Sequence, residues 1–149
     1  MRRIGVTVQE ILESKPNKIP ILSPNQTIFD ALEELTGSDE AAVLIVDAGS
    51  VVGIFSEKDY IKRVVMKGLG NNTKLKEVMT TMVKVVSPNF TAEDCMRAMS
   101  ENNLRHLPVV DNNQVIGFLN IIDVIKSVLS KKEQVIVHLE KYVSKTWPL

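Results

Sequence analysis

The stretch VVGIFSEKDYIKRVV, residues 51–65, decides the fold because the chain contains it twice. It begins as an apolar run, breaks at Gly53 and passes Ser56 and Asp59 before apolar residues recur at helical spacing. A near copy, VIGFLNIIDVIKSVL, occupies residues 115–129 and keeps both the glycine and the aspartate. Each copy is therefore predicted to form a strand, a break and a helix.

The repeat extends well beyond these two stretches. When residues 23–65 are aligned with residues 87–129 without a gap, 13 of 43 positions are identical, against roughly three expected by chance. Upstream, VQEIL at 8–12 matches LKEVM at 75–79, and the first copy has three extra residues in between. The chain is thus two copies of one unit of roughly 60 residues.

Each unit is predicted to have the element order β-α-β-β-α. Ser-Pro-Asn turns precede the first helices, and polar turns join the apolar runs of the hairpins. In the first unit the strand, helix, hairpin and second helix are expected at 18–22, 27–38, 41–55 and 57–67. In the second unit they are expected at 82–86, 91–102, 106–119 and 121–130.

The closing helix of the second unit is apolar on almost every side. Its sequence IIDVIKSVL, residues 121–129, leaves little room for a solvated face. A helix of this kind is buried on both sides. We expect it to pack on its own sheet and on either the other unit or a second subunit, which predicts a homodimer.

Composition limits the class of protein. The chain has 149 residues, an apolar content of 44% and a formal net charge of zero, which suits a globular domain and argues against nucleic-acid or anionic-membrane partners. Cys95 is its single cysteine, so no internal disulfide forms and a reducing compartment is expected. The first residues lack an apolar run typical of a signal peptide, and no 18-residue apolar stretch occurs. We expect a cytoplasmic protein.

Three further pieces add to the repeat: RHLPVVD at 105–111, the pair Met79-Thr80 and GIFSEKD at 53–59. In this order the sequence resembles a pair of CBS domains, the Bateman module. The resemblance implies an α/β (α+β) fold of two tandem β-α-β-β-α repeats packed with pseudo-two-fold symmetry. It divides the chain into an N-terminal extension with repeat 1, a linker, repeat 2 and a C-terminal helix or tail, at 1–66, 67–74, 75–130 and 131–149.

The resemblance also implies two clefts that bind adenosine-containing ligands: AMP, ADP or ATP, and in some members NAD or S-adenosylmethionine. The family's Asp holds the ribose hydroxyls, and its Ser or Thr lies near the ribose and phosphate. By position, the first cleft takes Ala41, Ala42, Ser56, Lys58, Asp59, Arg63, Thr80 and Val83. The second takes Ile19, Pro20, Arg105, His106, Asn120 and Asp123, where Asn120 departs from the usual Ser or Thr.

The residue chemistry fits this assignment, and it also fits a simpler one. An ionised Asp59 accepts hydrogen bonds from two adjacent hydroxyls, and Lys58 and Arg63 lie close enough in sequence to help neutralise a phosphate. However, Ser-x-x-Asp is also the pattern of a capping box. Such a cap and a ligand contact are compatible, so both interpretations stay open for Asp59. Locally, Arg105 and His106 also fit a plain surface pair.

The two clefts are predicted to differ in strength. Asn120, Ile122 and Ser127 replace the serine, lysine and arginine of the first copy, which predicts that the Asp59 cleft binds nucleotides more tightly. Arg105 and His106 argue the other way, because they would add a basic pair to the second cleft.

The sequence contains no nucleophile–base set, metal-ligand spacing or paired-acid constellation. We therefore predict a non-catalytic adenine-nucleotide sensor without a catalytic cofactor, which forms a homodimer and regulates a protein partner. The alternatives are a ligand-free dimerisation scaffold and a nucleic-acid-binding CBS protein, and the zero net charge counts against the latter. The C-terminal stretch EQVIVHLEKYVSKTW, residues 133–147, is either an output element or a strap for the dimer.

Overall fold

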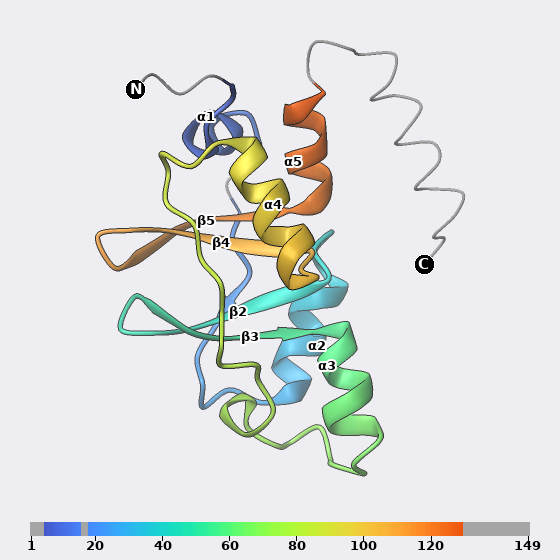
Figure 1. Cartoon of the computed structure of the whole chain (residues 1–149). Helices are drawn as coiled ribbons and strands as arrows, with labels where there is room; N and C mark the ends of the chain where they lie inside the picture. The colour runs from blue at the N-terminus through green and yellow to red at the C-terminus, as the bar shows by residue number, and fades with distance from the viewer. Residues whose placement is uncertain (1–4, 16–17, 130–149) are drawn as a thin grey trace.

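The computed structural model describes residues 5–15 and 18–129, and these form two stacked halves (Figure 1). The first half contains β1 (Ile21–Leu22), α2 (Ile28–Thr36), β2 (Ala42–Asp47), β3 (Ser50–Ser56) and α3 (Glu57–Asp59). The second contains α4 (Ala92–Asn102), β4 (His106–Asp111), β5 (Gln114–Asn120) and α5 (Ile121–Val128). The predicted mixed α/β fold of two similar units is confirmed, and the second unit differs by lacking its opening strand.

Both halves are built on an antiparallel hairpin with the same register. In β2–β3 and in β4–β5 the pairing shifts at equivalent places, between Ile45 and Val46 and between Val109 and Val110. The second hairpin turns through Asn112 and Asn113, which both have positive φ, as a two-residue type I′ turn requires. The polar turns predicted from the sequence are therefore hairpin turns.

The prediction of a strand at 82–86 is wrong, because only its last residue takes part in strand pairing. Val86 alone forms a parallel bridge, to Val109. In the first half, the Leu44 amide donates to the Pro20 carbonyl at 2.8 Å, which helps to fix β1 beside β2. Proline stands at the equivalent of Leu44 in the second half, at position 108, and it has no amide hydrogen to donate. The expected strand at 18–22 likewise shortens to β1.

The helix expected at 57–67 is interrupted. After α3 the chain continues as a π-helical segment, η1 (Tyr60–Val65), whose wider turns are visible in bonds such as Met66 amide to Ile61 carbonyl at 3.0 Å. In a segment this short, the spacing of the apolar residues is compatible with both an α-helix and a π-helix, so the sequence could not distinguish them. Val64 is buried in the first half, whereas Ile61 and Val65 are 57% and 53% exposed.

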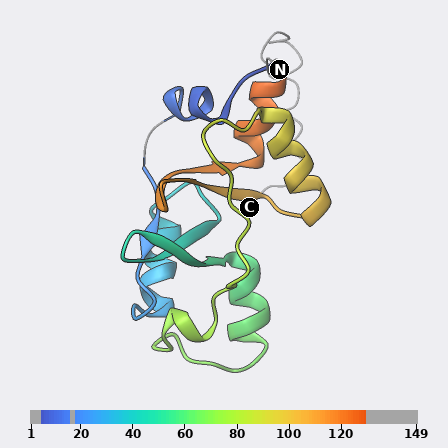
Figure 2. The same cartoon turned by 60° about the vertical axis from the view of Figure 1, so that its left-hand side comes forward.

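The opening segments of the two units are exchanged. Helix α1 (Val8–Glu13) lies beside α4 and α5 of the second half (Figures 1 and 2), and its Val8 and Ile11 join that core. The matching segment Leu75–Glu77, a 3-10 turn, begins with a residue buried in the core of the first half. The segment that precedes the first half therefore completes the second half, and the segment that precedes the second half completes the first. We call these two stretches the crossing segments.

A third, smaller apolar cluster joins the two sheets. Ala42, Leu44 and Phe118 are buried there, with Ile19 and Ile54 packed against them. Helix α5 contributes the buried Val124 to the second-half core, while its other apolar side chains are only partly buried. Within residues 5–15 and 18–129, no helix has the length and apolar character needed to cross a membrane.

Candidate functional site

The first predicted cleft is centred on the Asp59 carboxylate. Its Oδ2 accepts the Ser56 amide at 2.9 Å and the Ser56 hydroxyl at 3.1 Å, while the Asp59 amide donates back to the Ser56 Oγ at 3.2 Å. The predicted capping box therefore exists. It fixes one carboxylate oxygen at the end of β3 and leaves the other to meet a different part of the chain.

Thr80 supplies that second contact from the crossing segment. Its hydroxyl donates to Asp59 Oδ1 at 3.1 Å, and its backbone pairs with Ile54 through two bonds of 2.9 Å. Arg63 lies on the same oxygen, with its Nε 3.7 Å from Oδ1, and its Nη1 donates to the Met79 carbonyl at 3.0 Å. Residues predicted from both units thus meet at one carboxylate.

The other residues predicted for this cleft surround the group less directly. The Ala41 carbonyl accepts the Glu57 amide at 3.2 Å, so it lies at the beginning of α3, and Ala42 is fully buried beneath. Lys58 is exposed, and Val83 is half-buried further along the crossing segment. Of the two cations predicted for this cleft, Arg63 is the one that contacts the Asp59 carboxylate in the described part of the chain.

The second predicted cleft has the same cap with a different partner. Asn120 and Asp123 form a capping box, in which Asp123 Oδ2 accepts the Asn120 amide at 2.9 Å. The same oxygen accepts the Lys15 ammonium at 2.7 Å, and Lys15 also donates to the Phe118 carbonyl at 2.8 Å. In the first cleft, the Thr80 hydroxyl contacts Asp59 and the Thr80 amide donates to the Ile54 carbonyl. In the second cleft, the Lys15 ammonium makes both of the equivalent contacts.

Glu40 adds a carboxylate that has no counterpart in the first cleft. Its two oxygens accept the Asn120 side-chain amide at 3.2 and 3.3 Å. Lys15 Nζ lies 3.7 Å from one oxygen and His106 Nε2 lies 3.7 Å from the other. The residue equivalent to Glu40 in the second unit is Leu104, which packs against the apolar core.

His106 is a neutral ring at neutral pH. It stacks on Phe118 with ring centroids 5.2 Å apart and nearly parallel planes. Burial, together with the neighbouring cations Arg105 and Lys15, lowers the pKa of His106 to about 4 against the opposing effect of Asp123. The expected basic pair at this cleft is therefore wrong for His106, because its buried ring does not carry a charge at pH 7.

The remaining residues predicted for the second cleft frame it. Arg105 is exposed at the edge of β4, and its carbonyl accepts the Ile121 amide at 2.9 Å, as Ala41 does for Glu57 in the first unit. Pro20 is buried and Ile19 is half-buried against the cluster between the sheets.

Lys15 and Glu40 are the residues that the sequence reasoning missed. Lys15 is 108 positions from Asp123, and Glu40 is 80 positions from Asn120, so no local pattern links them. One signal was present for Lys15. It follows the segment 8–12 that aligns with 75–79, and Thr80 follows the latter.

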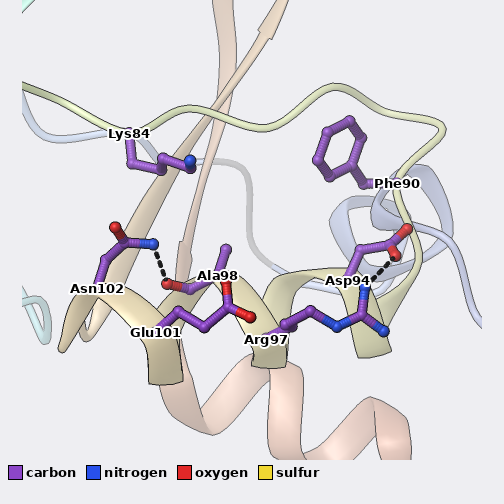
Figure 3. A pocket seen from close by; sticks show the side chains of 7 residues that line it. All are labelled: Lys84, Phe90, Asp94, Arg97, Ala98, Glu101 and Asn102. Carbon is purple, nitrogen blue, oxygen red and sulfur yellow. Dashed lines mark hydrogen bonds and ion pairs between the residues drawn. The ribbon is translucent and has the colours of Figure 1, made fainter.

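An open hollow of about 280 Å³ lies elsewhere, on the outer face of α4 (Figure 3). It contains none of the residues predicted for either cleft, and two of its charged side chains, Arg97 and Asp94, are paired with each other at 3.7 Å. Nearby, Cys95 points into the core, and burial together with Asp94 raises the pKa of its thiol to about 11. This thiol is therefore a packing group.

Chemically, both clefts offer a carboxylate for hydroxyl groups and a cation beside it. Over residues 5–15 and 18–129, no three His, Cys, Asp or Glu side chains are placed to share a metal ion. The arrangement suits hydrogen bonding to a polyhydroxylated ligand between the two halves.

Comparison with known proteins agrees with the repeat. The family model "CBS domain" matches twice, over residues 8–66 and 75–130. The chain belongs to the CBS-domain family. The predicted identification as a CBS-domain pair is confirmed, and the matched segments correspond to the two repeats found by self-alignment.

Similar proteins cover most of the chain. The CBS domain-containing protein CBSX3, mitochondrial, of Arabidopsis thaliana is 26% identical over 149 residues, which is 93% of this chain and 72% of that protein. A solved protein with CBS domains from Burkholderia ambifaria MC40-6 is 34% identical, with a TM-score of 0.79, covering 85% of this chain and 96% of the other.

Two further solved CBS structures contain adenosine compounds. CBSX2 was solved in complex with AMP, and it is 26% identical with a TM-score of 0.70, covering 86% of this chain and 99% of the other. The CBS-domain pair of MJ0100 was solved with 5′-methylthioadenosine and S-adenosyl-L-methionine. It is 27% identical with a TM-score of 0.73, covering 87% of this chain and all of the other.

Proposed function

We propose that this chain is a non-catalytic regulatory module that binds an adenosine-containing ligand between its two CBS repeats. The observation that carries the proposal is the Asp59 group, where a carboxylate positioned by Ser56 meets Thr80 from the crossing segment. The AMP complex of CBSX2 and the adenosine ligands of the MJ0100 pair support the same ligand class.

The chemistry of the Asp59 cleft favours a nucleotide. Asp59 accepts two hydrogen bonds from adjacent ribose hydroxyls, which replace the intramolecular donors that hold it in the free protein. Arg63, whose side chain is 44% exposed beside Asp59 Oδ1, supplies a positive charge for a phosphate. The exposed Lys58 adds a second cation on the neighbouring turn. We therefore propose AMP, ADP or ATP as the ligand here.

Regulation follows from the position of the ligand between the halves. Thr80 belongs to the segment that crosses from one half to the other, so ligand contact with Asp59 acts on both halves together. A ligand shifts the relative orientation of the halves only if it binds one arrangement more tightly. We propose that a separate protein partner reads this orientation.

We also propose that the module is a homodimer. Ile61 and Val65 on η1 and Phe29 on α2 are all more than half exposed, which is unusual for large apolar side chains on neighbouring helices of one half. Covering them with a second copy would remove this apolar surface from water.

The proposal is tested by ligand-linked stability. At 100 times its dissociation constant, a nucleotide that binds only the folded chain raises the free energy of unfolding by about 2.7 kcal/mol, which shifts the melting temperature by several degrees. AMP, ADP, ATP, NAD and S-adenosylmethionine are measured separately. Asp59→Ala should weaken AMP binding by about 30- to 150-fold, because hydrogen bonds worth roughly 2–3 kcal/mol are lost.

The matched control is Asp30→Ala, because Asp30 makes the same capping box with Thr27 and is not part of the predicted clefts. It should lower stability and leave the AMP affinity unchanged. If none of the five compounds shifts the melting temperature at millimolar concentration, the sensor function is refuted and the ligand-free scaffold is favoured. Oligonucleotide binding that weakens steeply with salt would favour the nucleic-acid alternative.

A further inference from the structure

The hydrogen-bond donors of the second cleft converge on Glu40. Its carboxylate is within 3.3 Å of the Asn120 amide nitrogen and 3.7 Å from both Lys15 Nζ and His106 Nε2. Its side chain is only 15% exposed. The Glu40 carboxylate is therefore a fixed negative charge within the cleft. Its neutral and cationic partners come from three different parts of the chain.

These donors are also the groups that a ligand phosphate would need in this cleft. Asn120 stands where Ser56 stands in the first cleft, and Lys15 is the ammonium on the Asp123 carboxylate. With Glu40 in place, a phosphate must displace a buried carboxylate or lie beside it. Like charges at about 4 Å repel strongly where water is scarce. His106 offers no compensating charge, because it is neutral at pH 7.

A ligand without phosphate meets no such obstacle. Ribose hydroxyls need an acceptor, which Asp123 supplies, and a flat base has the His106 ring nearby, which keeps 14% of its side-chain surface exposed. A positively charged substituent would be attracted by Glu40. Arg105 at the edge of the cleft is exposed, so its charge is screened by solvent more than that of Glu40.

We infer that Glu40 makes the Asp123 cleft selective for adenosine compounds that lack a phosphate, neutral or cationic, whereas the Asp59 cleft accepts the nucleotide. This inference rests on the proposed function and goes beyond it by giving the two clefts different ligand classes. The first cleft has no carboxylate at the position of Glu40, since the equivalent residue there is Leu104. Its cation Arg63 is partly exposed and accessible to a phosphate.

The test compares AMP with adenosine by isothermal titration. On an Asp59→Ala background, which weakens the first cleft, adenosine should bind at least tenfold more tightly than AMP. Adding Glu40→Gln should tighten AMP at least tenfold, equivalent to about 1.4 kcal/mol, and leave adenosine nearly unchanged. Glu33→Gln, which makes the same charge change on the exposed face of α2, should alter neither affinity.

A measurement on the unmodified chain covers the case in which Glu40→Gln does not fold. Wild-type protein crystallised with AMP should contain AMP at Asp59, with Glu40 still bonded to Asn120. A phosphate seated on Asn120 overturns the inference, and so does an Asp59→Ala protein that binds AMP as tightly as adenosine. In both cases the proposed function survives, because a nucleotide is bound. If wild-type protein binds neither compound, the inference fails, whereas the proposed function fails only if ADP, ATP, NAD and S-adenosylmethionine also leave the melting temperature unchanged.

Discussion

Lowering the pH should destabilise this protein through one buried side chain, His106. Its ring is stacked on Phe118, and its Nε2 lies 3.7 Å from the Glu40 carboxylate. Burial, Arg105 and Lys15 lower its pKa from 6.5 to about 4, although Asp123 acts in the opposite direction. The folded chain therefore takes up a proton at His106 only at much lower pH than the unfolded chain does.

The sign and size of the effect follow from this difference. Between pH 6.5 and about 4 the unfolded state binds more protons than the folded state, so the free energy of unfolding falls as the pH falls. The stabilising contribution is complete above pH 6.5. Each pH unit within the window is worth at most about 1.4 kcal/mol. At pH 5 the loss relative to pH 7.5 amounts to about 2 kcal/mol.

The assay is urea denaturation of wild-type and His106→Gln proteins at pH 7.5, 6 and 5. Glutamine removes the titrating ring, so its loss of stacking with Phe118 is the same at every pH. Other titrating groups are shared by the two proteins. The stability advantage of the wild type should therefore shrink by about 2 kcal/mol between pH 7.5 and 5. Parallel stability curves for the two proteins would refute the assignment of a low pKa to His106.

Three further predictions concern packing and assembly. Lys15→Met should lower the free energy of unfolding by about 2 kcal/mol. Breaking a fully buried ion pair costs about 3–5 kcal/mol, and the effect here is smaller because Lys15 and Asp123 keep 18% and 19% of their side-chain surface exposed. A urea double-mutant cycle with Asp123→Asn that shows no coupling would contradict this prediction. Gly117→Ala and Gly53→Ala would each place a Cβ 2.5 Å from a packed side-chain atom, so each should cost about 1–3 kcal/mol, and unchanged melting temperatures would show that the neighbours yield freely. Val65→Asp should convert the proposed dimer into a folded monomer of 16.6 kDa, as measured by light scattering, and a wild-type monomer would refute the dimer.

Local patterns predicted the framework of the fold well. Four of the five Ser/Thr/Asn-x-x-Asp patterns are capping boxes, at Thr27, Ser56, Thr91 and Asn120. The fifth, Thr36 to Asp39, lies at the end of α2 rather than at the beginning of a helix. A capping box involves residues only three apart, so the sequence contains all the information it needs. The hairpins were predictable for the same reason, because turn and paired strands are contiguous.

Contacts between distant segments were predictable only where the resemblance to the CBS-domain family indicated which residues share a cleft. The family resemblance predicted that Thr80 lies in the same cleft as Asp59, and in the structure the two side chains are hydrogen-bonded at 3.1 Å. Lys15 and Glu40 were missed because their partners are about a hundred residues away and no repeat copy contains the same pair. The absent strand at 82–86 was different. Proline at 108 removes a donor that the aligned first copy uses, and this substitution is visible in the sequence.

The asymmetry of the two clefts also gives a physical route between them. Glu40 and Ala41 are neighbours in the chain, but they serve different clefts. The Ala41 carbonyl accepts the Glu57 amide at the beginning of α3, within the Ser56–Asp59 capping box. The Glu40 side chain holds Asn120 of the other repeat. A nucleotide bound at Asp59 that moved the beginning of α3 would therefore act on the same short stretch of backbone that carries the Glu40 carboxylate. Duplication alone would produce two equal sites, and in the inference proposed above the Glu40 carboxylate gives the two clefts different ligand classes.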